Sequence, residues 1–451
     1  MFEKAMSFVL IFSGLITHDF SLPNSRPPSD LLVSRTTGQP QTQFHSVTAD
    51  PEKWREDLRF LATELPRRHV NFFHDLSPDE FQRAVDELDA AIPTMSDHAI
   101  IVGMVRIVAM AREAHTSLDW GGIDSRYPFR IYPIDFLNLK DGLFVKAITL
   151  SGPATNRGRV RYRRALGARV VRIGDTDIES AKSAIAALIA TENQAWVTAR
   201  IPAFINSPEI LHGLGLLPDM EQGRFTFEDS RGEQFEFIFT PVARTPPPST
   251  IQFPFISRIP IQLYRTRPSS QFYWFEYLEN ARTIYFQYNR CSEMSSLPFA
   301  NFLQQFVSFI DTHDVQRLVV DLRNNPGGNS AILQPLINAV VSRPHINQRG
   351  SLFVAINEGT ASSGVLNAID FQRRTQAILI GGPTGGKPNS YGEIRSFNLP
   401  NSGIRVVYST RFFQLLPGAD PPSLMPNILI ELSSTDYFAG RDPVLESALA
   451  F

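Results

Sequence analysis

A serine at the start of a predicted helix is the first residue whose setting could support chemistry. The apolar stretch LFVAIN, Leu352–Asn357, predicts a buried strand, and EGTASSGVLNAID follows it as a turn and a helix. Ser362 therefore falls at or near the helix N-terminus, where unpaired N–H groups and the helix dipole favour developing negative charge. The residue is either an ordinary N-cap or a nucleophile beside its own oxyanion donors.

A turn with almost no side chains ends the preceding predicted strand. The stretch RLVVDLRNNPGGNS, Arg317–Ser330, runs from apolar residues into Gly327 and Gly328. Adjacent strands of a parallel sheet place their C-terminal loops side by side. We therefore expect a glycine N–H and the N–H of Ser363 to converge on one carbonyl oxygen, which such a bare backbone would admit.

A lysine lies in a third loop that belongs at the same edge of the sheet. The stretch IGGPTGGKPNSYGE follows the next predicted strand, and Lys387 comes 25 residues after Ser362 (387 − 362). One helix and one strand separate the two residues, so the chain returns to the edge that carries the serine.

Three motifs in this order resemble one family of enzymes. VVDLRNNPGGNS, TASSGVLNA and IGGPTGGKP are similar to the tail-specific, or C-terminal processing, serine peptidases and to the related tricorn core proteases. The resemblance covers roughly residues 282–451 and implies a ClpP/crotonase-like α/β core. It also implies a peptide or protein substrate, with no metal and no cofactor.

The resemblance assigns roles to the residues of the three loops. It makes Ser362 the nucleophile and Gly327 or Gly328, with the N–H of Ser363, the oxyanion hole. In the processing-peptidase branch, Lys387 would be the general base. This chain departs from that branch at two positions: Val365 stands where a glutamate is expected, and Tyr391 where a glutamine is expected.

The tricorn branch instead takes a histidine from the helical region. MAREAHTSLDW puts His115 at the end of the third predicted helix, and Asp420, in PGADPPS, is the candidate carboxylate to orient it. Lowering a lysine pKa from about 10.4 to 7–8 costs about 3–5 kcal/mol, whereas a histidine is already mostly neutral at pH 7. We therefore favour His115 as the base, with Lys387 as a substrate or structural contact.

The composition bounds the remaining function classes. The chain has 451 residues, 43% of them hydrophobic, and 43 Lys plus Arg balance 45 Asp plus Glu for a net charge of −2. This balance argues against nucleic-acid binding. Cys291 is the one cysteine of the sequence, so neither an internal disulfide nor a cysteine zinc cluster can form.

Periodicity and turn residues divide the chain into four parts. We predict a signal-like segment and linker over 1–50, a helical cap over 51–127, a PDZ-like mixed α/β region over 128–270 and a catalytic α/β core over 271–451. A PDZ-like groove would bind a peptide as an added strand. The alternative for the middle region is an α/β insert with no binding role.

The N-terminus predicts the compartment. The apolar run Met6–Ile16 is too short for a membrane span of about 20 residues and resembles the core of a secretory signal. We expect an extracytoplasmic protein, periplasmic or secreted, with a cytoplasmic one as the alternative. The oligomeric state does not follow from the sequence.

The leading interpretation is a serine peptidase that forms an acyl-enzyme on Ser362. The departures at Val365 and Tyr391 motivate an alternative, a non-catalytic peptide-binding protein on the same scaffold. A third candidate is a crotonase-like enzyme acting on acyl thioesters, because related folds also pair backbone N–H groups.

Overall fold

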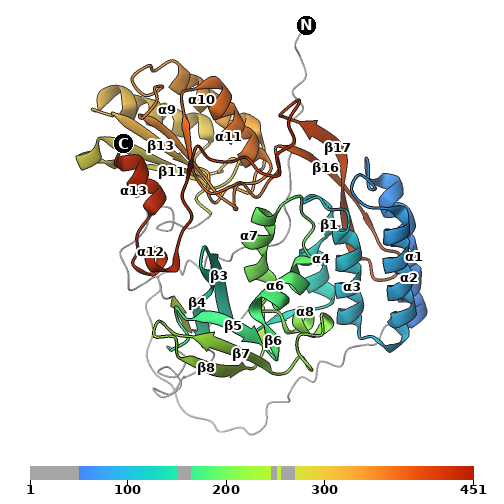
Figure 1. Ribbon diagram of the computed structural model, residues 1–451. Helices are drawn as coiled ribbons and strands as arrows, with labels where there is room; N and C mark the ends of the chain where they lie inside the picture. Colours follow the sequence, from blue (N-terminus) through green and yellow to red (C-terminus); the bar gives the residue numbers. More distant parts are fainter. Residues whose placement is uncertain (1–49, 151–163, 245–250, 255–269) are drawn as a thin grey trace, which may run out of the picture.

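The structure is a computed structural model that describes residues 50–150, 164–244, 251–254 and 270–451. The predicted signal-like segment and nearly all of the predicted linker lie outside these residues, as does most of the segment between the middle region and the core. Figure 1 gives the arrangement of the elements.

The helical cap begins with three helices, each with a side-chain cap. Asp50, Ser77 and Ser96 accept hydrogen bonds from backbone N–H groups of the first turns of α1, α2 and α3. The helices run over α1 Pro51–Arg68, α2 Pro78–Ala91 with the 3₁₀ turn η1 Ile92–Thr94, α3 Asp97–Ala109, and the shorter α4 Trp120–Arg126.

The described residues of the middle region form an antiparallel sheet and three helices. Its strands pair in the order β10-β4-β5-β7-β8, with β3 added to β4 and β6 to β5, and β2 pairs with β9. The elements are β2 Arg130–Ile131, β3 Ile134–Leu139, β4 Gly142–Leu150, β5 Arg169–Ile173, β6 Thr176–Asp177, α6 Ile178–Ala186, α7 Gln194–Phe204, α8 Pro208–Gly213, β7 Gly223–Glu228, β8 Gln234–Phe239, β9 Val242–Ala243 and β10 Ile251–Pro254. The strand–turn–helix over residues 168–190 and the hairpin around Arg231-Gly232 agree with the mixed α/β pattern predicted for this region.

The cap and the middle region share one hydrophobic core. Leu58 and Ile101 of the cap belong to the same buried cluster as Val170, Phe225 and Phe227 of the middle sheet. The two parts are therefore stabilised as one packing unit.

The core sheet is parallel except at one edge, as the alternating strands and helices predict. Its order is β11-β12-β13-β14-β15-β18, with β11 antiparallel to β12. The elements are β11 Tyr273–Leu278, η4 Glu279–Ala281, β12 Thr283–Tyr288, α9 Phe299–Thr312, β13 Arg317–Asp321, η5 Ser330–Leu333, α10 Gln334–Val341, β14 Leu352–Ile356, α11 Ser363–Arg374, β15 Ile378–Gly381, β18 Ile428–Leu429, α12 Ser434–Phe438 and α13 Pro443–Leu449.

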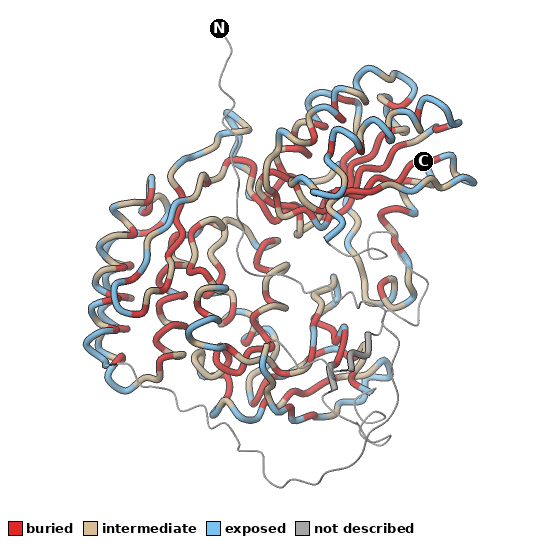
Figure 2. Tube along the Cα trace, turned by 180° about the vertical axis from the view of Figure 1, so that it is seen from behind, coloured by how far each residue is buried: buried red, intermediate tan, exposed pale blue. Residues whose placement is uncertain are grey.

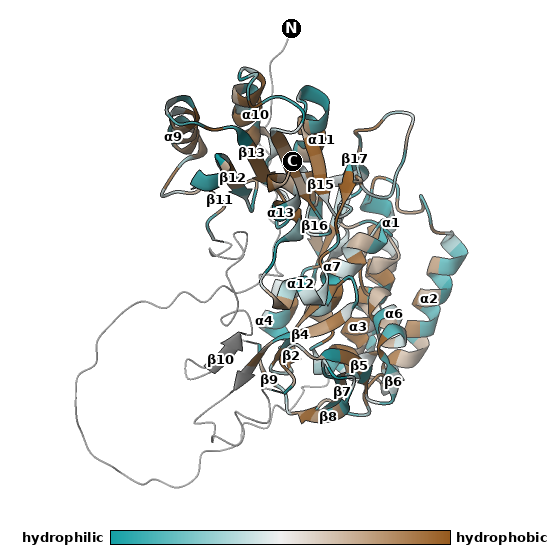
Figure 3. Cartoon of the chain, turned by 60° about the vertical axis from the view of Figure 1, so that its left-hand side comes forward, coloured by the Kyte–Doolittle hydropathy of each residue, from teal (hydrophilic) through white to brown (hydrophobic). Residues whose placement is uncertain are grey.

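Helices cover both faces of this sheet. Phe302, Leu336 and Phe371, from α9, α10 and α11, are buried on one face, and Val444 and Ala448 of α13 are buried on the other. The central strands β13, β14 and β15 are buried almost throughout (Figure 2), and β13 and β15 are strongly hydrophobic (Figure 3). The predicted mixed α/β fold is confirmed.

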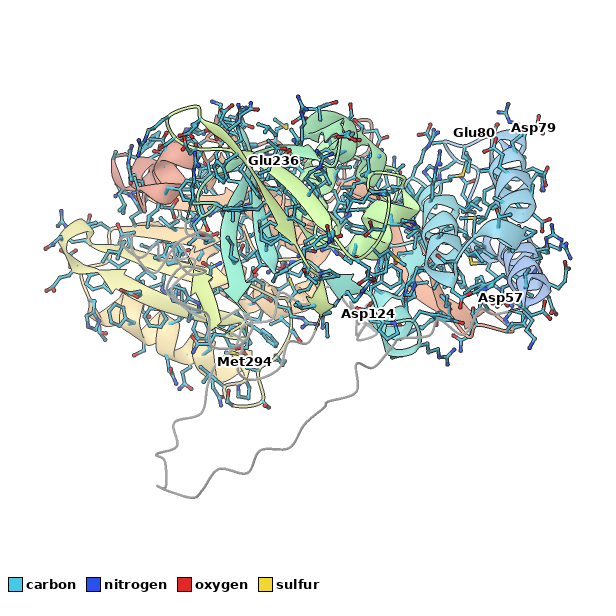
Figure 4. The ribbon with its side chains drawn as sticks, turned by 90° about the horizontal axis from the view of Figure 1, so that it is seen from below. Asp57, Asp79, Glu80, Asp124, Glu236 and Met294 are labelled. Atoms are coloured by element: carbon cyan, nitrogen blue, oxygen red, sulfur yellow. The ribbon has the colours of Figure 1, made fainter. Side chains whose placement is uncertain are left out.

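A long two-stranded ribbon connects the core to the cap. β16 Asn389–Asn398 and β17 Arg405–Gln414 are antiparallel, and the short strand β1 Ser117–Leu118 pairs with β17. At the far end of the ribbon, the buried Asp57 of α1 accepts the N–H groups of Asn401 and Ser402, each at 2.8 Å (Figure 4). The ribbon therefore fixes the loop before β1 relative to the core sheet.

The described residues contain neither a candidate membrane span nor a candidate metal cluster. No helix among them is both long and apolar enough to cross a membrane. No group of three or more His, Cys, Asp or Glu side chains in the same part of the chain could hold a metal ion.

Candidate active site

Ser362 lies at a sharp turn between β14 and α11. It is the N-cap residue of α11, and its backbone has φ 48° and ψ −125°. A non-glycine residue rarely adopts a positive φ, and strained serines between a strand and a helix are typical of exposed nucleophiles. The turn requires a glycine at position 364, because any Cβ there would lie only 2.7 Å from the Asn325 carbonyl oxygen.

The structure brings His115 to this serine. The imidazole Nε2 lies 3.3 Å from Ser362 Oγ, although 247 residues separate them. The prediction that His115 ends the third helix is wrong, because α3 stops at Ala109 and Arg112 takes a positive φ of 50°. His115 instead belongs to the loop that leads into β1, and pairing of β1 with β17 sets its position.

The glycine turn after β13 lies against the serine turn after β14. Ser363 Oγ donates to the Gly328 carbonyl at 2.6 Å. A Cβ on Gly327 would lie 2.7 Å from Ser362 Cβ and 2.9 Å from the Ser363 nitrogen. A side chain on Gly327 would therefore fill the space beside Ser362 and the Ser363 N–H that a substrate carbonyl has to occupy.

The hydrogen bonds of the turn separate the two candidate glycine donors. The Gly327 N–H donates to Asn325 Oδ1 at 2.9 Å, so it is not available to a substrate. The Gly327 carbonyl accepts from the Cys291 N–H at 3.0 Å, and in a trans peptide this leaves the Gly328 N–H on the opposite side. Among the described residues, no protein atom accepts from the N–H of Gly328 or of Ser363.

Cys291 supports this turn and is not a competing nucleophile. Its thiol is buried and lies 3.4 Å from Asn325 Oδ1 and 3.3 Å from Asn367 Oδ1. Burial raises the pKa of the Cys291 thiol to about 12, so the reactive thiolate is scarce at neutral pH.

Lys387 and Asp420 pair with each other. Lys387 Nζ lies 2.7 Å from Asp420 Oδ2, and Asn389 Nδ2 donates to the other Asp420 oxygen at 3.3 Å. The Asp420 side chain is 62% exposed. Asp420 is therefore engaged by Lys387 and Asn389 and not by the imidazole it was expected to orient.

The carboxylate beside His115 is Glu113, which sequence reasoning missed. Its Oε2 lies 3.8 Å from His115 Nδ1 and accepts the His115 backbone N–H at 2.7 Å. Its Oε1 accepts from Ser409 Oγ at 3.0 Å and lies 3.3 Å from His69 Nε2. The Glu-x-His spacing was the available signal, but only the fold shows that this carboxylate is fully buried.

The hydrogen bonds of His69 define its own tautomer and place an N–H donor on Glu113. The Asn71 N–H donates to His69 Nδ1 at 3.0 Å, so this nitrogen carries no proton and Nε2 is the one that donates to Glu113. Burial acts to raise the pKa of Glu113, but the hydrogen bond from His69 and the charge of His115 outweigh burial and lower it. Glu113 is therefore ionised behind the imidazole.

Burial keeps His115 in the neutral form that a base requires. It lowers the pKa of His115, against the opposing effects of the Glu113 charge and a backbone hydrogen bond with Tyr391. Tyr391 is one of the two departures, and its ring packs on His69 at 5.4 Å between centroids. The other departure, Val365, is buried in the core beside Gly386.

The middle region adds two residues to the pocket. Glu192 and Trp196, from the start of α7, line the same pocket as Ser362, His115 and Lys387. The sequence analysis gave neither residue a role. Nothing local distinguishes Glu192, because its place depends on packing against residues almost 200 positions later in the chain.

A second cavity, of about 340 Å³, lies in the middle region. It opens between the turn that joins β3 to β4, the start of β5 and the first turn of α6, with Leu143, Val170 and Ile178 in its walls. The turn is attached to the core, because the Lys140 N–H donates to the Leu432 carbonyl at 3.0 Å. Peptide binding in a PDZ-like groove here stays a prediction.

No family model and no curated protein matches the sequence. Solved structures, by contrast, share its fold. Mature CPAF complexed with lactacystin aligns with 89% of this chain and 98% of its own, at 11% identity and a TM-score of 0.57. Mature CPAF alone aligns over 88% and 96%, at 10% identity and the same TM-score. A photosystem II D1 C-terminal processing protease aligns over 90% and 97%, at 13% identity and a TM-score of 0.39. The chain therefore shares its fold with mature CPAF over nearly its whole described length.

Proposed function

We propose that this protein is a serine peptidase in which Ser362 is the nucleophile and His115 the general base. The observation that carries the proposal is the 3.3 Å approach of His115 Nε2 to the hydroxyl of a serine held at positive φ. The shared fold with CPAF and the three motifs that resemble the tail-specific peptidases support it independently.

The geometry supports an acyl-transfer mechanism. His115 Nε2 accepts the Ser362 proton as Oγ bonds to the scissile carbonyl carbon, and the carbonyl π electrons move to the oxygen. The N–H groups of Gly328 and Ser363 would hold that oxyanion, at about 2.7–4 kcal/mol for each donor. The imidazolium then gives its proton to the leaving amine, and water hydrolyses the acyl-enzyme by the reverse sequence.

Glu113 stabilises the imidazolium in this proposal. At 3.8 Å its Oε2 is too far from Nδ1 for a hydrogen bond, so it acts through its charge in a water-poor setting. Lys387 Nζ instead pairs with Asp420, and within the described residues no hydrogen bond joins it to Ser362. We therefore assign the base to His115 and a structural or substrate contact to Lys387.

A fluorophosphonate probe tests the proposal, because it labels activated serines. We expect labelling of the natural protein, its loss in Ser362→Ala, and its retention in Ser308→Ala, an exposed serine on α9. Mass spectrometry of a mixed peptide library would then locate cleaved bonds. Absence of labelling with bound peptide would favour the non-catalytic binding protein, which no contact in the described site favours at present.

A further inference from the structure

The first turn of α7 is built into the catalytic pocket. Asn193 Nδ2 donates to the carbonyls of Gly385 at 3.0 Å and Pro422 at 2.7 Å, and its Oδ1 accepts the Trp196 N–H at 2.8 Å. Trp196 packs so closely on Gly385 that a Cβ there would lie 2.8 Å from the indole ring. These contacts hold the residue before Asn193 at a fixed place in the site.

That residue, Glu192, presents a carboxyl group to the pocket. Its Oε2 accepts the Ala114 N–H at 3.2 Å, and the pocket it lines also contains Ser362 and His115. The apolar side chains of Ala114, Trp196 and Ala361 complete the walls. The Glu192 side chain therefore lies in the same pocket as the nucleophile and the base.

When Glu192 ionises, the charges around it leave a negative surplus. Lys387, also in the pocket, is matched by Asp420 at 2.7 Å, while the ionised Glu113 lies behind His115. In the described part of the chain, Glu192 itself has no basic side chain within salt-bridge distance. Burial first, and then the charge of Glu113, raise the pKa of Glu192 to about 8, and Lys387 opposes this shift only in part.

We propose that Glu192 is a specificity-determining residue that binds a cationic side chain, lysine or arginine, next to the scissile bond of the substrate. A substrate cation would supply the counter-charge that the pocket lacks, and it would be held beside the nucleophile. This inference rests on the proposed peptidase function and adds the substrate class.

Matched peptides test the inference once a cleaved bond is known. Each residue flanking that bond is set to Lys, Gln or Glu, and kcat/KM is measured for every peptide. We expect roughly tenfold preference for Lys over Gln at one flanking position, and a larger one over Glu. The preference should increase between pH 7 and 9, as Glu192 ionises while the substrate lysine stays charged.

Two variants distinguish recognition of the substrate cation from structural support of the His115 loop. Glu192→Gln keeps an oxygen for the Ala114 N–H and should lose the Lys preference while it still cleaves the Gln peptide. Glu87→Gln, an exposed glutamate on α2, should keep the preference. If Glu192→Gln instead lowers kcat/KM equally on all three peptides, Glu192 only supports the His115 loop, and the inference is wrong.

The outcomes also distinguish this inference from the proposed function. If Glu192→Gln still reacts with the fluorophosphonate probe and its Lys preference equals that of the natural protein, recognition by Glu192 is wrong and the peptidase stands. If the natural protein neither reacts with the probe nor cleaves any peptide, both fail together.

Discussion

Two glycine turns lie at the carboxyl edge of the core sheet, one after β13 and one after β15. In the first, Gly327 and Gly328 have positive φ angles of 110° and 133°, and the Gly328 N–H has no acceptor within the described protein. In the second, the Gly386 N–H donates to the Thr360 carbonyl at 3.1 Å and the Gly385 carbonyl accepts from Asn193. The first turn leaves the Gly328 N–H for a ligand, whereas the Gly385 carbonyl of the second turn helps to seat the start of α7.

The difference shows that glycine content alone does not identify an oxyanion site. Both turns admit close neighbours, and in both a Cβ would meet protein atoms at less than 3.0 Å. A Cβ on Gly327 would lie nearest to Ser362 Cβ, at 2.7 Å, but a Cβ on Gly328 or Gly385 would lie 2.2 Å from a backbone carbonyl oxygen, that of Cys291 or of Glu358. Which backbone groups remain unpaired decides the chemistry of a turn.

The largest expected effect concerns the base. His115→Ala should lower kcat by about 10⁴-fold, because Ser362 loses its proton acceptor. Lys387→Ala, in the second turn, should lower kcat by less than about tenfold, because its partner Asp420 is largely exposed. Steady-state rates on one cleaved peptide measure both effects. A larger loss of kcat in Lys387→Ala than in His115→Ala would mean that Lys387, in the second turn, is the general base.

The next effect compares the turns directly. Gly327→Ala should lower kcat by about 10²–10³-fold, since its methyl group would displace Ser362 and cover the Ser363 N–H. Gly385→Ala should instead cost about 1–3 kcal/mol of unfolding free energy, because its methyl group meets backbone and Trp196. Gly382→Ala, whose nearest contact would be 3.7 Å, is the control for both.

Kinetics and denaturant titrations together decide between these effects. Both variants should unfold at a lower denaturant midpoint than the Gly382→Ala control, and Gly327→Ala does so partly because an alanine is strained at its φ of 110°. Turnover should fall far more in Gly327→Ala than in Gly385→Ala, and equal turnover of the two folded variants would mean that both turns serve packing alone.

The sequence predicted the parts of this molecule that depend on local pattern. The apolar strands β12 to β15 and the capped helices α1 to α3 follow from periodicity and from Asp50, Ser77 and Ser96. The three loops of the core meet because parallel strands share an edge, a rule that needs no side-chain detail.

The parts that it missed depend on contacts between distant segments. The loop that carries His115 leaves the helical pattern because Ser117 pairs with Val407, almost 300 residues away. Glu113 becomes a buried carboxylate only through Ser409 and His69. Glu192 enters the pocket through a helix of the middle region, which local pattern gave no reason to join to the core.

The smallest expected effect concerns the carboxylate that stabilises protonated His115. Glu113→Gln should lower kcat by about 10–10²-fold, because the imidazolium loses a nearby negative charge. The charge of Glu113 acts to raise the pKa of His115, so its removal should lower that pKa further. The acidic limb of the kcat profile, where His115 becomes protonated, should then move to lower pH in Glu113→Gln.

Asp420→Asn is the matched change at the second turn. It removes a carboxylate that contacts Lys387 and leaves Glu113 in place, so its acidic limb should coincide with that of the natural protein and its kcat should fall by no more than about threefold. If the limb instead moves in Asp420→Asn and stays fixed in Glu113→Gln, the carboxylate that acts on His115 belongs to the second turn. That turn would then take part in catalysis as well as in seating α7.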